Sequence, residues 1–228
     1  MQLMQELRDI SDRWAKDKSF FSFNFLVKCY QIIKEKQMGK IILASSSPRR
    51  ADILKKMKLD FDVIPSEYDE PHTQTVFSCE FVEKLTYNKA LDVAKKLNTR
   101  GENILVLGAD TIVVIDNKIL GKPQDYDDAF ETLKMLSAKT HFVVTSVAVI
   151  NSENFEYIVK SDKTFVTFEN LTDTQIKFYL DDFKPFDKAG SYGIQELPEG
   201  FVKSVDGQID NVIGLPSKLV KELLEKMS

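Results

Sequence analysis

The chain has 228 residues, of which 43% are hydrophobic and 29% are charged, so it can form a sizeable core. Its net charge of −4 argues against nucleic-acid binding driven by overall charge. Two cysteines and two histidines give no disulfide framework and no zinc-ligand spacing, and no apolar run is long enough to span a membrane. We therefore expect a globular, cytoplasmic protein with one large domain or two small ones.

Residues 1–37 are predicted to be an N-terminal extension of unknown role. Its first half is mostly polar, and segment 20–33 is rich in aromatic residues. The acidic start and the lack of an apolar leader do not match a transit or secretory peptide. A docked helix, a partner-binding arm and a disordered segment all remain open. The core domain is predicted to span 38–228, because Met38 directly precedes the first predicted strand.

Residues 41–50 predict a strand, a tight turn and the start of a helix. Three serines end the apolar run, and Pro48 suits the first helical position after an N-cap at Ser47. Arg49 and Arg50 then occupy the first helical turn, where the helix dipole disfavours cations. Two guanidinium groups beside free N–H groups suit a phosphate, although a solvated basic turn would have the same sequence.

A polar loop over 65–80 follows a short predicted strand at 61–64 and carries Glu70. Long loops of this kind in compact domains are often functional. The next pattern predicts a helix over 79–97, with Lys89 on its apolar stripe. A lysine in that position either extends its ammonium to the solvent or meets an anion in a cleft.

The apolar run at 104–115 predicts a buried strand that Asp110 interrupts. A carboxylate there must be paired, hydrogen-bonded or bound to a metal, and an ion pair inside the fold is the plain alternative to a functional role. A turn at 116–117 predicts a hairpin into 119–120, and Lys122 follows beside a further chain reversal.

The second half of the chain is predicted to contain both helices and strands. Predicted helices cover 126–136, 172–181 and about 216–227, and predicted strands cover 141–150, 155–159, 164–168 and a hairpin of 201–205 with 209–213. Segment 185–195 has small residues around Tyr192 and Gln195, which suits either close approach to a ligand or a flexible connector. This order predicts an α/β fold with a mixed central sheet flanked by helices, forming two lobes around a cleft.

Charged residues far apart in the sequence would form one site if the fold brought them together. They are the cations Arg49, Arg50, Lys89, Lys122 and Lys188 and the carboxylates Asp69, Glu70 and Asp110. Such a set suits a polyphosphate with a divalent cation.

Eight short motifs, taken in order, resemble those of the Maf-type nucleoside triphosphate pyrophosphatases. They are LASSSPRR (43–50), DE (69–70), NKA (88–90), GADT (108–111), GKP (121–123), DKAG (187–190), YGIQ (192–195) and VIGLP (212–216). Each motif is weak alone, but eight in the same order make a chance match improbable. The resemblance covers residue 39 to the C-terminus.

The resemblance implies two lobes around a cleft, as in the inosine triphosphate pyrophosphatases. It also implies a homodimer that hydrolyses a nucleoside triphosphate to the monophosphate and pyrophosphate with Mg²⁺ or Mn²⁺; neither nucleic acid nor a membrane is expected as a partner. Arg49, Thr111 and Gln195 match the branch that resembles the dTTP/UTP pyrophosphatases. The 7-methyl-GTP branch instead has tryptophan at the first of these positions and glutamine at the second. Residues 196–199 depart from the pattern, because Glu-Leu-Pro-Glu replaces a glycine-rich segment.

The resemblance also implies a role for each matching residue. Asp110 would orient and deprotonate the attacking water and would share a metal with Glu70. Thr111 and Gln195 would read the pyrimidine edge, and Arg49 would contribute to specificity and to the triphosphate clamp. The other phosphate-binding residues would be Ser45, Ser46, Ser47, Arg50, Lys89, Lys122 and Lys188.

Two other functions remain open. One is a house-cleaning pyrophosphatase for 7-methyl-GTP or ITP. The other is a nucleotide-binding regulator of cell division without turnover, since the family resembled here is often linked to septum formation. The presence of Asp110 favours an enzyme, because a binding protein needs the cations but has less need of a buried base.

Overall fold

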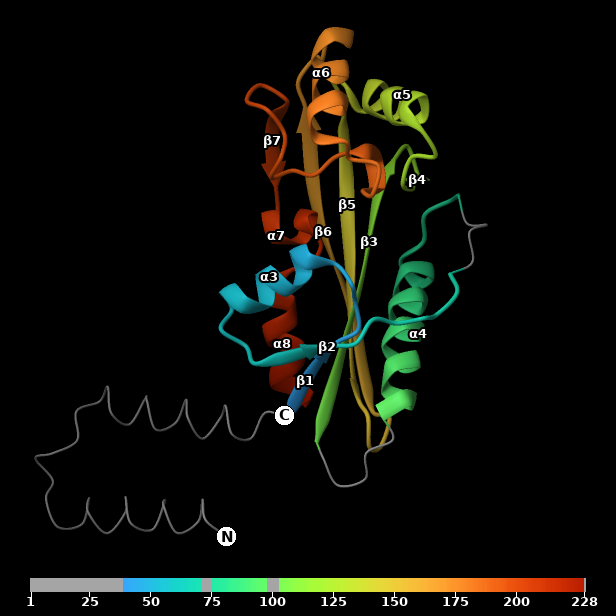
Figure 1. The fold of residues 1–228 in the computed structure, drawn as a ribbon, viewed down its shortest axis with the longest axis vertical. Helices are drawn as coiled ribbons and strands as arrows, with labels where there is room; N and C mark the ends of the chain where they lie inside the picture. Colours follow the sequence, from blue (N-terminus) through green and yellow to red (C-terminus); the bar gives the residue numbers. More distant parts are fainter. Residues whose placement is uncertain (1–38, 71–74, 98–102, 228) are drawn as a thin grey trace, which may run out of the picture. The chain divides into compact units, whose positions relative to one another are not determined.

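A computed structural model describes residues 39–70, 75–97 and 103–227 of the chain (Figure 1). The predicted extension 1–37 and His72 lie outside these described residues. The described chain is built on a mixed seven-stranded sheet of order β2-β1-β3-β5-β6-β7, with β4 added beside β3. The predicted α/β class with a mixed central sheet is therefore confirmed.

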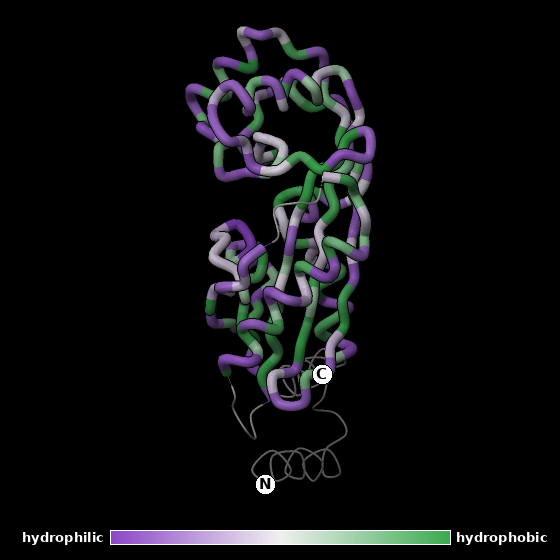
Figure 2. The backbone as a smooth tube through the Cα atoms, turned by 90° about the vertical axis from the view of Figure 1, so that its right-hand side faces the viewer, coloured by the Kyte–Doolittle hydropathy of each residue, from purple (hydrophilic) through white to green (hydrophobic). Residues whose placement is uncertain are grey.

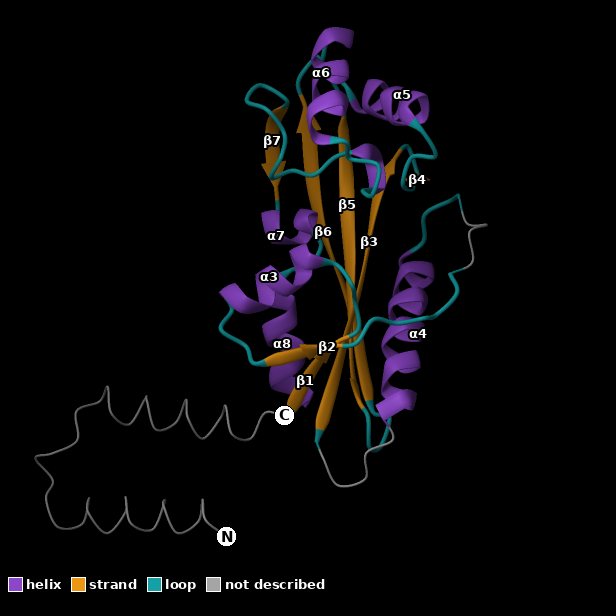
Figure 3. Cartoon of the chain, in the orientation of Figure 1, coloured by secondary structure: helices purple, strands orange, loops and turns teal. Residues whose placement is uncertain are grey.

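The strands divide into a short parallel part and a long antiparallel part. They are β1 (Lys40–Leu43), β2 (Phe61–Val63), β3 (Ile104–Ile115), β4 (Lys118–Leu120), β5 (Thr140–Asn151), β6 (Tyr157–Phe168) and β7 (Val202–Asp206). β1 pairs in parallel with β2 and with the first part of β3, and all other pairs are antiparallel. The three long strands β3, β5 and β6 run through the whole domain (Figure 3).

Helices cover both faces of these long strands. They are α3 (Pro48–Lys56), α4 (Cys79–Leu97), α5 (Tyr126–Leu136), α6 (Asp173–Phe183), α7 (Ile209–Ile213), α8 (Ser217–Met227) and the 3₁₀ turn η1 (Ala189–Ser191). α4 packs on β3 and β5 from one face, and α7 and α8 pack from the other (Figure 1). Hydrophobic residues concentrate along the strands, as Figure 2 shows. Within the described residues, no helix is both long and apolar enough to cross a bilayer.

The elements form two lobes that share the long strands. The first lobe holds β1, β2, α3, α4, α7 and α8, and the second holds β4, β7, α5, α6 and η1. The core of the second lobe includes Leu133, Phe168, Tyr179 and Tyr192, whereas Val93 and Ile150 belong to the core under α4. The predicted arrangement of two lobes is thus observed.

Several local predictions are confirmed. The helices at 79–97 and 126–136 have the predicted bounds, and Thr172 and Gln175 form the predicted capping box of α6. Helix α3 begins at Pro48 with Ser47 as its N-cap, although the Ser47 side chain makes no capping hydrogen bond.

Two predictions about the second half of the sheet are wrong. Segment 209–213 is not the second strand of a hairpin but helix α7, whose Asn211 is buried and donates to Val143 O and Thr164 Oγ1. The predicted strands 155–159 and 164–168 belong to one continuous strand, β6, which begins at Tyr157, because the polar residues between them stay in register with β5.

Gly108 determines how closely α4 approaches β3. A Cβ at this position would lie 2.9 Å from Ala90 Cβ and 3.0 Å from Thr86 O, both in α4. We expect Gly108→Ala to lower the free energy of unfolding by about 1–3 kcal/mol, the usual cost of overpacking. Urea unfolding measures this, with Gly121→Ala as the control because a Cβ there has no neighbour within 4 Å. Equal midpoints for both variants and the wild type would show that the helix can move aside freely.

Candidate active site

A cavity of about 980 Å³ lies between the two lobes. The first lobe contributes the serine turn, α3 and α4 to its walls, and the second contributes segments 121–124 and 187–196. Ligand sites usually have volumes of about 300–1,000 Å³, so this cavity can hold a molecule as large as a nucleotide.

The cavity opens at an unpaired edge of β3. β1 pairs with β3 only as far as Leu107, and β4 pairs with it only from Val113 onward, so the stretch between them has a strand neighbour on the β5 side alone. Successive side chains of a strand point to opposite faces. Asp110 therefore faces α4 and Thr111 faces α7, yet both line the same cavity around the open edge.

Arg50 joins three parts of this cavity wall. Its Nε donates to Gly214 O at 2.9 Å, its Nη1 to Ser45 Oγ at 2.9 Å and its Nη2 to Thr111 Oγ1 at 3.2 Å. Burial lowers the pKa of Arg50, and the nearby Asp110 carboxylate partly offsets this, but a guanidinium stays charged at neutral pH. The side chain thus presents a fixed positive charge to the cavity.

The serine turn presents polar groups beside Arg50. Ser45 Oγ also accepts from the Ser47 N–H at 3.2 Å, and α3 has no acidic residue in its first turn. Ser46 and Ser47 line the cavity too. The local sequence therefore places a helix N-terminus, serine hydroxyls and two arginines at one wall, a set suited to an anion.

Lys89 reaches the cavity from the α4 side and meets carboxylates. Its Nζ lies 2.7 Å from Asp110 Oδ1 and 2.8 Å from Glu70 Oε1. The side chains of Lys89 and Asp110 are only 14% and 13% exposed, so this pair is largely removed from water. Lys89 was predicted either to extend its ammonium to the solvent or to meet an anion in a cleft, and the second prediction is correct. Asp110 forms the internal ion pair that was predicted for it as the alternative to a functional role.

Glu70 and Asp110 are the carboxylates that could hold a divalent cation here. Within the described residues, no group of three or more aspartate, glutamate, histidine or cysteine side chains could do so. Mg²⁺ is commonly bound by one or two carboxylates together with substrate phosphates and water. The pair therefore fits Mg²⁺ or Mn²⁺ that arrives with a polyphosphate, and it does not fit a metal centre closed by protein ligands alone.

Lys188 is the second lobe's buried cation. Its Nζ lies 2.8 Å from Asp187 Oδ1 and 3.1 Å from Glu196 Oε2, and its side chain is 9% exposed. Partial burial raises the pKa of Asp187, but the hydrogen bond from Lys188 and the positive charges of Lys188 and Arg49 together outweigh this and keep that pKa below its usual value. Asp187 also pairs with Arg49 of α3 at 3.3 Å, so an ion pair joins the two lobes across the cavity.

The structure brings the predicted catalytic, metal-binding, phosphate-binding and specificity residues to this one cavity. They are Ser45, Ser46, Ser47, Arg49, Arg50, Glu70, Lys89, Asp110, Thr111, Lys122, Lys188 and Gln195. Lys122 and Gln195 are exposed, and among the described residues neither is in a salt bridge. Asp69 is exposed and does not line the cavity, so it stands apart from the cluster.

Sequence reasoning missed the buried network behind Thr111. Thr111 Oγ1 lies 3.0 Å from Thr145 Oγ1, which donates to Asn211 O at 2.8 Å, and the Thr145 N–H donates to Asn211 Oδ1 at 3.2 Å. These bonds fix α7 and hence the Gly214 carbonyl that Arg50 binds. The only available signal was a pair of threonines in predicted strands, which gives no partner.

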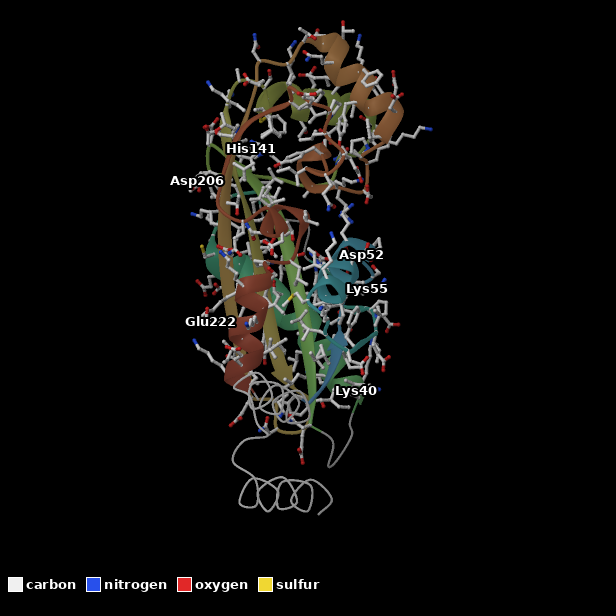
Figure 4. All side chains as sticks on the ribbon, turned by 90° about the vertical axis from the view of Figure 1, so that its left-hand side faces the viewer. Lys40, Asp52, Lys55, His141, Asp206 and Glu222 are labelled. Atoms are coloured by element: carbon white, nitrogen blue, oxygen red, sulfur yellow. The ribbon has the colours of Figure 1, made fainter. Side chains whose placement is uncertain are left out.

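His141, labelled in Figure 4, is buried in the second lobe beside a residue of the cavity wall. Its Nε2 lies 2.7 Å from the hydroxyl of Tyr192, a wall residue, and burial lowers the pKa of His141 to about 4. Unfolded histidine takes a proton near pH 6.5, so the unfolded chain binds more protons between pH 6.5 and 4. We expect this residue to remove stability on the order of 3 kcal/mol as the pH falls through that window.

Comparison with His141→Gln isolates this effect, because glutamine does not titrate. Urea unfolding at several pH values is expected to show the wild type losing more stability than the variant below pH 6.5 and the same amount above it. Parallel curves for the two proteins would mean that His141 is protonated equally in both states.

The chain is similar to proteins of one known family. The family model of Maf-like proteins matches residues 40–227. Similar proteins include the dTTP/UTP pyrophosphatases of Acetivibrio thermocellus, 44% identical over 82% of this chain and 95% of the relative, and of Thermosipho africanus, 47% identical over 81% and 92%. That of Ruminiclostridium cellulolyticum is 43% identical over 84% and 97%. The chain therefore belongs to the Maf-like protein family.

Proposed function

We propose that this protein is a metal-dependent nucleoside triphosphate pyrophosphatase that converts dTTP and UTP to the monophosphate and pyrophosphate. The observation that carries the proposal is the placement of Asp110, a carboxylate at the unpaired edge of β3 that faces a cavity lined by cations. The names of the similar proteins support the reaction and the choice of nucleotides.

The cations would hold the triphosphate. Arg50 is already fixed by three hydrogen bonds, so it can stabilise charge on the phosphates without rearrangement. Lys122 is exposed on the opposite wall and forms no salt bridge within the described part of the chain, so it is available to bind phosphate. Lys89 and Lys188 each contact two carboxylates, which leaves one of the three donors of each ammonium for a phosphate oxygen.

Asp110 would act as the base. Lys89 holds its Oδ1, which leaves Oδ2 to accept the proton of a water directed at the α-phosphorus. The water oxygen bonds to that phosphorus, and the bond to the bridging oxygen breaks with its electron pair leaving on pyrophosphate. Glu70 and Asp110 would hold a divalent cation, which would neutralise charge on the phosphates when bound.

Residues at the outer part of the cavity would recognise the base. Gln195 has a side-chain donor and acceptor and is exposed on the wall, so it can pair with a pyrimidine edge. Arg49 lies near it, since both also line a second, smaller cavity beside α3. Thr111 already binds Arg50 and Thr145, so we expect it to act on specificity by fixing those neighbours.

Pyrophosphate release from a panel of nucleotides tests the proposal. We expect dTTP and UTP to be hydrolysed faster than ITP and 7-methyl-GTP, and only with Mg²⁺ or Mn²⁺ present. A strong preference for 7-methyl-GTP would overturn the substrate assignment. Tight nucleotide binding without metal-stimulated release would instead indicate a binding regulator. We also propose a homodimer, on the family resemblance, and a cytoplasmic location, because the two cysteines give no disulfide framework.

A further inference from the structure

Glu196 is a carboxylate of the cavity wall to which the proposed mechanism gives no role. It directly follows the YGIQ motif of residues 192–195. Its Oε2 is buried and lies 3.1 Å from Lys188 Nζ, but it accepts no hydrogen bond from the described residues. The side chain as a whole is 37% exposed, and Glu196 lines the cavity.

A tight turn sets the position of this carboxylate. The Glu196 N–H donates to Gly193 O at 2.8 Å, which places Gln195 at the outside of the turn and directs Glu196 back to Lys188. A Cβ on Gly193 would lie 2.9 Å from Lys188 Cε and 3.0 Å from Glu196 Oε2. The missing side chain at this glycine therefore makes room for the ion pair. Glu196 thus contacts Lys188, which is proposed to bind phosphate, and follows Gln195, which is proposed to recognise the base.

The part of a nucleotide that lies between its phosphates and its base is the sugar. An ionised carboxylate only accepts hydrogen bonds, and the donors that a sugar offers are its hydroxyl groups. The names of the similar proteins include one deoxyribonucleotide and one ribonucleotide, and these two share the 3′-hydroxyl. A carboxylate that serves both substrates would therefore read that group.

Resting on the proposed function, we propose that Glu196 accepts a hydrogen bond from the sugar 3′-hydroxyl and selects nucleotides that carry it. Lys188 orients the carboxylate by holding Oε2, and the other oxygen accepts from the sugar. An analogue without the 3′-hydroxyl would cover this other oxygen without giving it a hydrogen bond, so the analogue is disfavoured.

The test compares dTTP with 2′,3′-dideoxythymidine triphosphate, which differs only at the 3′ position. We expect the wild type to have a kcat/KM about 10–100-fold higher for dTTP, as suits a charged hydrogen bond. Glu196→Ala is expected to lower kcat/KM for dTTP to nearly that of the analogue and to change the analogue little. Glu199→Ala, on an exposed residue of the same loop outside the cavity, should keep the wild-type ratio.

Two results would overturn the assignment. One is a wild type that treats both nucleotides alike, and the other is a Glu196→Ala variant that loses the same factor on both, which would mean that Glu196 only positions Lys188. A change confined to the ratio of UTP to dUTP would assign the carboxylate to the 2′-hydroxyl instead and would also refute the proposal. If the wild type hydrolyses neither nucleotide, the proposed function fails. The dissociation constants of dTTP and of the dideoxy analogue, measured for the wild type and for Glu196→Ala, would then test the sugar contact separately.

Discussion

Replacing Asp110 with asparagine is expected to lower kcat for dTTP by about 10²–10⁴-fold, the usual contribution of a general base. Asparagine has the same shape but cannot take the proton of the attacking water. Nucleotide binding should persist, because the change removes a negative charge that faces the triphosphate, and Arg50 keeps its own contacts. Pyrophosphate release at saturating dTTP measures kcat, and calorimetry measures the dissociation constant.

Asp69→Asn is the matched control for this experiment. Asp69 lies next to Glu70 in the chain, but it is exposed and does not line the cavity. Its asparagine variant should therefore retain wild-type turnover. A folded Asp110→Asn protein with turnover near that of the wild type would show that the base is another group.

Replacing Arg50 with lysine is expected to lower kcat/KM by about 10²–10³-fold, comparable to the loss of a positioned donor to developing charge. The ammonium of lysine cannot reproduce the planar fork that binds Gly214, Ser45 and Thr111 at once. We also expect a lower melting temperature, because buried acceptors lose their donors. Steady-state kinetics and thermal unfolding measure the two effects separately.

Lys55→Ala on the same helix is the control for Arg50→Lys. Lys55 is exposed and pairs with Asp52 on the solvent side of α3, as Figure 4 labels them, and such surface pairs contribute little. Its kinetics should match the wild type. If Arg50→Lys also keeps kcat/KM within a few-fold, a single positive charge would suffice at that position, and the three-way contact would be structural only.

Local sequence signals predicted most elements because they depend on neighbours in the chain. The apolar spacing of 79–97 and 126–136 and the capping box at Thr172 are of this kind. The errors at 209–213 and in β6 have a different cause. A five-residue segment is too short to show a period, and α7 is held by bonds from Asn211 to two strands distant in sequence.

The residues of the candidate site could be predicted from the sequence, but the ion pairs between them could not. Unusual placements such as Arg50 in a first helical turn and Asp110 in an apolar strand marked residues that the fold brings together. Nothing in the sequence gave the partners Glu70 for Lys89 or Glu196 for Lys188, because these depend on where the strands beside β3 begin and end. The proposed roles themselves came from the family resemblance.

A crystal structure of Asp110→Asn grown with dTTP and Mg²⁺ would test the central claim most directly. We predict intact dTTP between the two lobes, with its α-phosphorus nearest residue 110 and its β- and γ-phosphates among Arg50, Lys122 and Lys188. Nucleotide bound at any other surface, or bound in the cavity with its base toward residue 110, would contradict it.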